Sequence, residues 1–158
     1  MIDVLSGMVP DRGELGAEFQ PIAHVLASAL GDRGRIRDSV RDPQRALALR
    51  RHLIAERESS DDHLELARMQ ELLCERTGRS ELLDEAVHHH EKAVALADAD
   101  GVPSPGALAG LAWTLNLRYE RSGDDADRDA AIAAGRQSRR PLRATAVSDA
   151  DWRSSRRP

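Results

Sequence analysis

A stretch in the second half of the chain is repeated, and this repeat constrains the fold more than any other feature. Residues 75–78 read Glu-Arg-Thr-Gly, and residues 120–123, 45 positions later, read Glu-Arg-Ser-Gly. The same offset aligns further positions without a gap: Leu66-Ala67 with Leu111-Ala112, Leu72 with Leu117, Asp84 with Asp129, and Ala86-Val87 with Ala131-Ile132. A period of this length marks supersecondary units that bury their apolar faces by stacking on neighbours. The chain is therefore expected to fold as a row of similar units.

The repeated units are expected to be pairs of α-helices. Apolar residues recur at three- and four-residue steps, and the alternation typical of strands is absent. Ser59 with Asp62 and Ser104 before Pro105 are typical helix starts, and Gly78 is a typical helix end. Hydrophobic residues make up 41% of the 158 positions, which is enough apolar material for one modest core.

The prediction is an all-α solenoid of αα-hairpins with about three helix pairs. The repeat domain spans residues 18–138, with units at about 18–58, 60–98 and 104–138. The first helix is expected to run from Glu18 to Leu30, because a charged segment with two glycines follows it and resembles a connector.

The two ends of the chain are expected to lie outside the repeats. Residues 1–17 are predicted to form a loose lead-in, since they carry three glycines and a proline among acidic residues. Residues 139–158 carry six arginines and two aspartates and lose the helical period after Pro141. This basic segment is predicted to be disordered and solvated. Contact with the acidic body, with an acidic partner or with phosphate remains open.

Composition excludes several classes of protein. The net charge is −4 and arginines are interspersed with acids, which disfavours nucleic-acid binding. No leader-like segment and no apolar stretch long enough to span a membrane occurs, so neither secretion nor membrane insertion is expected. Cys74 is the single cysteine, so a reducing cytoplasm is the expected location. Of the 23 basic residues, all but Lys92 are arginines, which indicates a GC-rich bacterial genome. No cofactor is expected.

Residues 84–96, DEAVHHHEKAVAL, resemble the second helix of a tetratricopeptide repeat, with Ala86 and Ala93 at the two small-residue positions of that family. The pairs Leu66-Ala67 and Leu111-Ala112 resemble the leucine and small residue of its first helix. The resemblance is good over 60–138 and poor over 18–58. In the poor part, the matching positions are Ala46, Leu47, Leu53 and Ile54.

The sequence departs from the family's pattern in two respects, and these indicate which type of repeat array it resembles. The unit is 45 residues long, against about 34 in the family, and the first helices lack the family's aromatic residues. Long repeats with this turn resemble the arrays of actinobacterial multidomain proteins, where they accompany CHAT peptidase or signalling ATPase domains. What the resemblance implies is a right-handed superhelix that binds protein in a concave groove lined by first helices. The positions carried over from the family are Arg68, Glu71, Trp113 and Asn116.

Trp113 is the sharpest single candidate for binding. An aromatic side chain in a groove is a plausible anchor for a partner peptide or helix. The alternative is that Trp113 fills space between adjacent units. The sequence leaves both interpretations open.

The histidines and the cysteine are interpreted as structural. His88, His89 and His90 are successive, so on a helix they point about 100° apart and do not converge on one ion. His90 is expected to be a packed, neutral imidazole. Cys74 aligns with Tyr119 across the repeat and is expected in the core. No catalytic motif is present, so the chain is expected not to be an enzyme.

The functional prediction is therefore a protein–protein interaction or scaffold module, acting alone or as a regulatory part of a larger signalling protein. A second hypothesis is an adaptor that associates with itself through the exposed ends of the repeats. A third, which depends on the histidines and the basic segment, is a metal- or nucleic-acid-binding protein.

Overall fold

The computed structural model describes residues 1–8 and 16–139, and the predicted basic segment beyond Arg139 lies outside them. Seven α-helices, one 3-10 turn and no strand occur in these ranges. The elements are α1 (Ile2–Met8), η1 (Ala17–Phe19), α2 (Gln20–Ile36), α3 (Arg41–Glu56), α4 (Ser60–Thr77), α5 (Glu81–Ala99), α6 (Pro105–Ser122) and α7 (Asp125–Ser138). The all-α prediction is confirmed.

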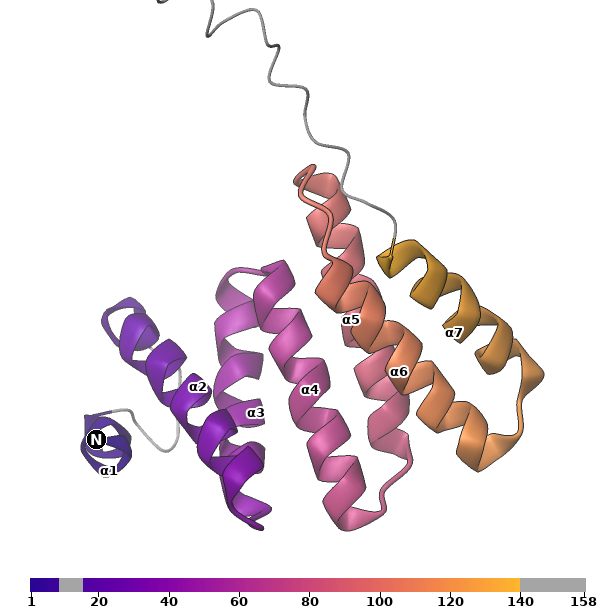
Figure 1. The fold of residues 1–158 in the computed structure, drawn as a ribbon. Coiled ribbons are helices and arrows are strands. Elements are labelled where there is room, and N and C mark those ends of the chain that lie inside the picture. The colour runs from indigo at the N-terminus through magenta and orange to yellow at the C-terminus, as the bar shows by residue number, and fades with distance from the viewer. Residues whose placement is uncertain (9–15, 140–158) are drawn as a thin grey trace, which may run out of the picture.

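The helices lie side by side in chain order, from α1 at one end of the row to α7 at the other (Figure 1). Helices α2 and α3, α4 and α5, and α6 and α7 form antiparallel hairpins, and each hairpin packs on the next through α3 with α4 and α5 with α6. The first helices α4 and α6 also contact each other. The prediction of about three pairs is corrected by α1, a seventh helix that packs on α2 within the segment expected to be loose.

The first hairpin is a unit of the same kind as the second, at an offset of 40 residues rather than 45. Leu26-Ala27 of α2 corresponds to Leu66-Ala67 of α4, and Ala46-Leu47 of α3 corresponds to Ala86-Val87 of α5. All eight side chains are buried. The five additional residues between later units are accommodated because α5 has 19 residues and α3 has 16, and because the linker 100–104 is longer than the linker 57–59.

Helix α2 continues six residues beyond the predicted end at Leu30, through two glycines. A Cβ atom on Gly34 would lie 2.9 Å from Cδ of Pro43, and one on Gly31 would lie 3.3 Å from the side chain of Met69. The glycines therefore permit α3 and α4 to approach α2 closely, and they are not a connector. The prediction was wrong because close approach and a turn both favour glycine.

The repeated Glu-Arg-Thr/Ser-Gly segment forms the same helix end twice, as predicted. Gly78 and Gly123 each have a φ of 72°, the left-handed conformation that closes a helix with little cost for glycine. The hydroxyl of Thr77 donates to the Leu73 carbonyl at 2.6 Å, and that of Ser122 donates to the Arg118 carbonyl at 2.9 Å.

The arginine of this segment connects neighbouring hairpins. Arg76 donates to the carbonyl of Ser39 in the preceding turn, and Arg121 lies with Nη1 2.8 Å from Sγ of Cys74. Both contacts reach back to the preceding unit, so the motif contributes to stacking.

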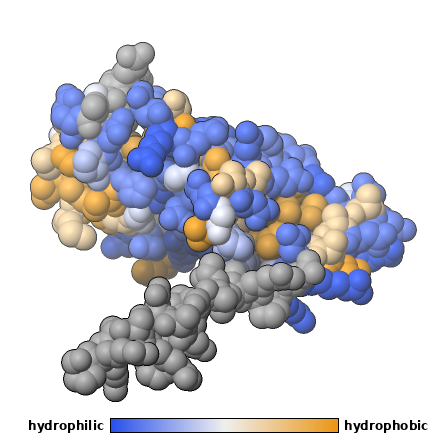
Figure 2. All heavy atoms as spheres, turned by 90° about the horizontal axis from the view of Figure 1, so that it is seen from above, coloured by the Kyte–Doolittle hydropathy of each residue, from blue (hydrophilic) through white to orange (hydrophobic). Residues whose placement is uncertain are grey.

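Exposed apolar side chains occur at both ends of the row. Val4 and Met8 of α1 are exposed at one end, and Ile132 of α7 is exposed at the other. Seen from above, hydrophilic side chains cover most of the face, while apolar ones gather at the end that carries α1 and also reach the surface toward the α7 end (Figure 2). The ends of the row are therefore the places where stacking is incomplete within the described residues.

Candidate functional site

The four predicted groove residues separate into an exposed pair and two residues with other contacts. Arg68 of α4 and Trp113 of α6 occupy corresponding positions in adjacent first helices. Trp113 is 59% exposed, whereas its neighbour Thr114 is fully buried. Trp113 therefore does not fill space between units, which was the alternative interpretation. We call Arg68 and Trp113, with the surface of α4 and α6 around them, the first-helix face.

Charged side chains surround Arg68 on this face. Its guanidinium donates to Oε1 of Glu65 at 2.6 Å, one turn earlier in α4. The other carboxylate oxygen of Glu65 lies 3.6 Å from Nη2 of Arg35 in α2. Such solvent-exposed pairs contribute little to stability, roughly 0–1 kcal/mol, so Arg68 can exchange its partner at small cost.

Glu71 lies inside a joint between three helices rather than on the first-helix face. Its Oε1 accepts from the hydroxyl of Thr114 in α6 and lies 2.8 Å from Nε2 of His90 in α5. A carboxylate accepts and does not donate, so Nε2 is the protonated nitrogen of His90. Both partners are buried. The carboxylate of Glu71 therefore holds α4, α5 and α6 together.

The fit of His90 depends on a glycine that sequence analysis did not identify. A Cβ atom on Gly110 of α6 would lie 2.3 Å from Cε1 of His90. The imidazole is fully buried, as predicted, and occupies the space that a larger residue at position 110 would fill. At the offset of 45 residues, Gly110 aligns with Glu65. The repeat therefore does not predict a glycine at this position or its contact with His90.

Asn116 lies three residues after Trp113 in α6 and is partly buried, whereas Trp113 is exposed. Its Nδ2 donates to Oε1 of Glu120 at 2.7 Å. It also lines a shallow cavity against α7, together with Ala112 and Ile132. The resemblance carried Asn116 into the groove, but the structure places it at the terminal end of the row.

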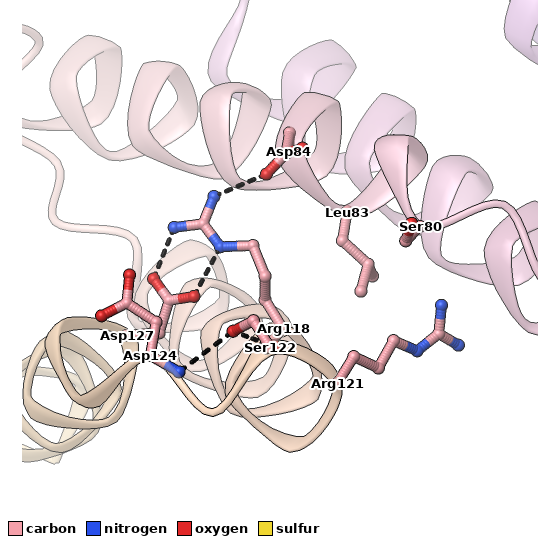
Figure 3. A pocket seen from close by; sticks show the side chains of 8 residues that line it. All are labelled: Ser80, Leu83, Asp84, Arg118, Arg121, Ser122, Asp124 and Asp127. Carbon is pink, nitrogen blue, oxygen red and sulfur yellow. Dashed lines mark hydrogen bonds and ion pairs between the residues drawn. The ribbon is translucent and has the colours of Figure 1, made fainter.

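A cavity of about 500 Å³ opens where α5, α6 and α7 meet (Figure 3). Arg118 lies across it: Nε donates to Oδ2 of Asp127 at 2.7 Å, and Nη1 donates to Oδ1 of Asp84 at 2.9 Å. The hydrogen bond from Arg118 lowers the pKa of the Asp127 carboxyl below its ordinary value. Arg118 thus binds both aspartates and joins α5, α6 and α7 across the cavity.

Arg118 binds Asp127 through both Nε and Nη2, and an arginine and an aspartate make the same two-bond contact in the first hairpin. Nε and Nη2 of Arg33 donate to the two carboxylate oxygens of Asp42 at 2.6 and 2.7 Å. Arginine and aspartate are nine residues apart in both hairpins and join the end of the first helix to the start of the second. In the middle hairpin, the corresponding positions are Leu73 and Leu82, which are both buried in the apolar core.

The three successive histidines point to three different environments. His88 is exposed, His90 contacts Glu71, and His89 has its Nδ1 atom 2.9 Å from Nδ1 of His63 in α4. Burial is the largest cause of a lowered pKa for both His63 and His89, and the pKa of His89 falls to about 4. Over residues 1–8 and 16–139, no group of three or more His, Cys, Asp or Glu side chains is arranged to hold a metal ion.

Comparison with known proteins does not indicate a function for this chain. No family model matches the chain, and no match was found among curated proteins. Within the part of the chain that the structure describes, none of the helices has both the length and the apolar character needed to cross a membrane. Cys74 is buried, as predicted.

Proposed function

We propose that this chain is a protein-interaction module of tetratricopeptide-like hairpins that binds a peptide or helix of a partner on the first-helix face. The observation that carries the proposal is the exposed indole of Trp113 on a helix whose next two residues, Thr114 and Leu115, are buried. Aromatic residues are only 3% of this chain, and Trp113 is exposed rather than packed in the core. Tryptophan and arginine are the side chains most often responsible for binding energy at interfaces.

The surrounding side chains indicate the kind of partner that would fit. Trp113 offers a flat apolar surface, and Arg68 offers a guanidinium whose present partner is a glutamate of the same helix surface. A peptide with one large apolar residue and a nearby carboxylate would cover the indole and replace Glu65 on Arg68. The proposed ligand is therefore an acidic, amphipathic segment.

The proposal gives the chain no catalytic role. In the cleft between α5, α6 and α7, Arg118 is paired with Asp84 and Asp127. The thiol of Cys74 is buried against Arg121, so it is not presented to a substrate.

The long repeat unit and the sequential stacking of hairpins support a tetratricopeptide-like solenoid. A single buried thiol also suits work in the reducing cytoplasm.

The experiment uses the fluorescence of Trp113 itself. The chain has two tryptophans, so Trp152→Phe leaves Trp113 as the single reporter. Peptides selected from a random phage-displayed library on this variant are synthesised and titrated. Binding at the first-helix face should shift the emission to shorter wavelength and protect the indole from iodide quenching, because the ring leaves water.

Two substitutions test the assigned residues. Trp113→Ala should weaken the selected peptides by about tenfold or more, as expected for an interface anchor. Arg68→Glu should weaken acidic peptides more than neutral ones. Glu91→Ala, an exposed position on α5, is the matched control and should bind as the parent does. The proposal fails if the library yields no binder, or if bound peptides leave both the Trp113 emission and the Trp113→Ala affinity unchanged.

A further inference from the structure

The outer face of α7 is exposed at positions that are buried in the two preceding units. Ile132 is 47% exposed, whereas Val87 at the corresponding position of α5 is 6% exposed and Leu47 of α3 is 7% exposed. In those hairpins a following first helix covers the position. No described element covers it in the last hairpin. Helix α7 therefore presents a stacking surface without its partner, and this surface is separate from the first-helix face.

Small residues leave room for close approach at this surface. The cavity beside Ile132 has a volume of about 380 Å³, and Ala112, Ala131 and Gly135 line it. A Cβ atom on Gly135 would meet only the Cβ of Ala112, at an ordinary contact distance of 3.8 Å. The space beside Gly135 is therefore not occupied by another side chain of this chain, unlike the space beside Gly34 or Gly110. A second helix could pack here with its backbone near that of α7.

The charges on this face are ordered along the helix. Asp125 and Asp129 lie before Ile132, and Arg136 and Arg139 lie after it. Consecutive members of this set are three or four residues apart, so they follow one side of α7, with Arg139 directly after its last residue. Asp125 and Asp129 contact Arg128 of their own helix, while Arg136 and Arg139 make no ion pair with any residue of the described ranges. The two arginines form the basic half of this face, and the other half, with Asp125, Asp129 and Arg128, carries one net negative charge.

We propose that two copies of this chain associate through this face, with the two α7 helices antiparallel and Ile132 at the two-fold axis. Antiparallel pairing brings Asp129 of each copy to Arg136 of the other, and Asp125 to Arg139. It also places opposite helix dipole ends together, which is favourable. The arrangement is isologous, since the same patch serves on both copies. Two copies thus supply each other with the layer that a further hairpin would supply.

The association is measured by sedimentation velocity over a range of protein concentrations, with circular dichroism to verify folding. The parent chain should show a monomer–dimer equilibrium. Ile132→Asp should abolish it, because two carboxylates would meet at the axis. Val25→Asp, which alters an equally exposed apolar residue on α2, is the matched control and should dimerise like the parent.

A charge-exchange experiment tests the antiparallel register. Asp129→Arg alone places a second guanidinium against Arg136 of the other copy, and Arg136→Asp alone places two aspartates together. Each variant should therefore dimerise at least about tenfold more weakly than the parent. An equimolar mixture of the two variants restores both ion pairs and should form a heterodimer. The combined variant D129R/R136D should form a homodimer again.

The outcomes separate cleanly. A parent chain that stays monomeric at millimolar concentration overturns the proposal, as does a dimer that persists in Ile132→Asp. A dimer that Ile132→Asp abolishes, but that the mixed charge variants fail to restore, overturns the antiparallel register. A symmetric disulfide formed by Ile132→Cys in a Cys74→Ser background, and absent from Glu91→Cys in the same background, would support it directly.

Discussion

His63 and His89 face each other across the α4–α5 hairpin with their Nδ1 atoms 2.9 Å apart. One of these nitrogens must donate a proton and the other must accept it, so the contact requires that the accepting imidazole is neutral. Burial lowers the pKa of both rings, and the nearby charges of His88 and Arg51 lower that of His89 further, to about 4. Burial between the two helices therefore favours the uncharged form of both histidines.

This contact predicts that stability falls as the solution is acidified. In the unfolded chain His89 has a pKa of about 6.5, and in the folded chain about 4, so the unfolded state binds more protons between these values. Its contribution is fully present above pH 6.5 and is lost as the pH falls toward 4. The loss is on the order of 2 kcal/mol after allowance for solvent screening. Urea denaturation at pH 7 and pH 4.5 measures it.

The control is a variant in which the titrating ring is replaced. His89→Gln should unfold with less difference between pH 7 and pH 4.5 than the parent, because its side chain does not titrate. Asp42 and Asp127 also have lowered pKa values, but their contributions are lost below about pH 3.8 and do not overlap this window. An equal pH dependence in parent and variant would contradict the assignment.

Thr114→Val should destabilise the joint between α4, α5 and α6 without unfolding it. Valine matches threonine in shape but removes the hydroxyl that donates to Glu71, which leaves that carboxylate with His90 as its remaining contact. The expected loss is about 1–2 kcal/mol in the free energy of unfolding. Thermal and urea denaturation measure it. Helix content that stays at the parent level would show that the change is local.

Gly110→Ala should destabilise the protein although alanine is the better helix former. Alanine gains about 1 kcal/mol in a helix interior relative to glycine. At position 110 its Cβ would lie 2.3 Å from the ring of His90, and overpacking of this kind costs about 1–3 kcal/mol. The clash should outweigh the gain. Gly106→Ala in the same helix meets nothing nearer than 4.0 Å, and it should leave the protein as stable or more so.

The sequence predicted the elements of this fold better than it predicted their contacts. Caps and helix ends, such as Ser59 and Gly78, are local signals, and the side chain of Ser59 does accept from the backbone of Asp62. The repeat at an offset of 45 residues located the second and third hairpins, because their matching positions align without a gap. The first hairpin was matched poorly because its offset is 40, and a comparison at one fixed spacing does not detect it.

Two of the four groove positions predicted from the resemblance are exposed, and the other two make contacts with neighbouring side chains. Arg68 and Trp113 are exposed on neighbouring first helices, as the position-by-position resemblance implied. Glu71 was misplaced because a helix position alone does not say whether its side chain faces solvent or the next two helices. That depends on Thr114 and Gly110, which lie some forty residues away and come together with His90 through packing. Such a joint is specified by three-dimensional contact rather than by spacing.

The arginine–aspartate pair of the last hairpin should be replaceable by two leucines, but neither partner should be removable alone. Arg118→Ala leaves Asp127 buried without its counter-charge, and a loss of about 2 kcal/mol is expected. The double variant R118L/D127L reproduces the Leu73 and Leu82 pair of the middle hairpin, so it should come within about 1 kcal/mol of the parent. Urea denaturation of the single and double variants forms a thermodynamic cycle. Additive losses would show that the two positions do not act as one contact.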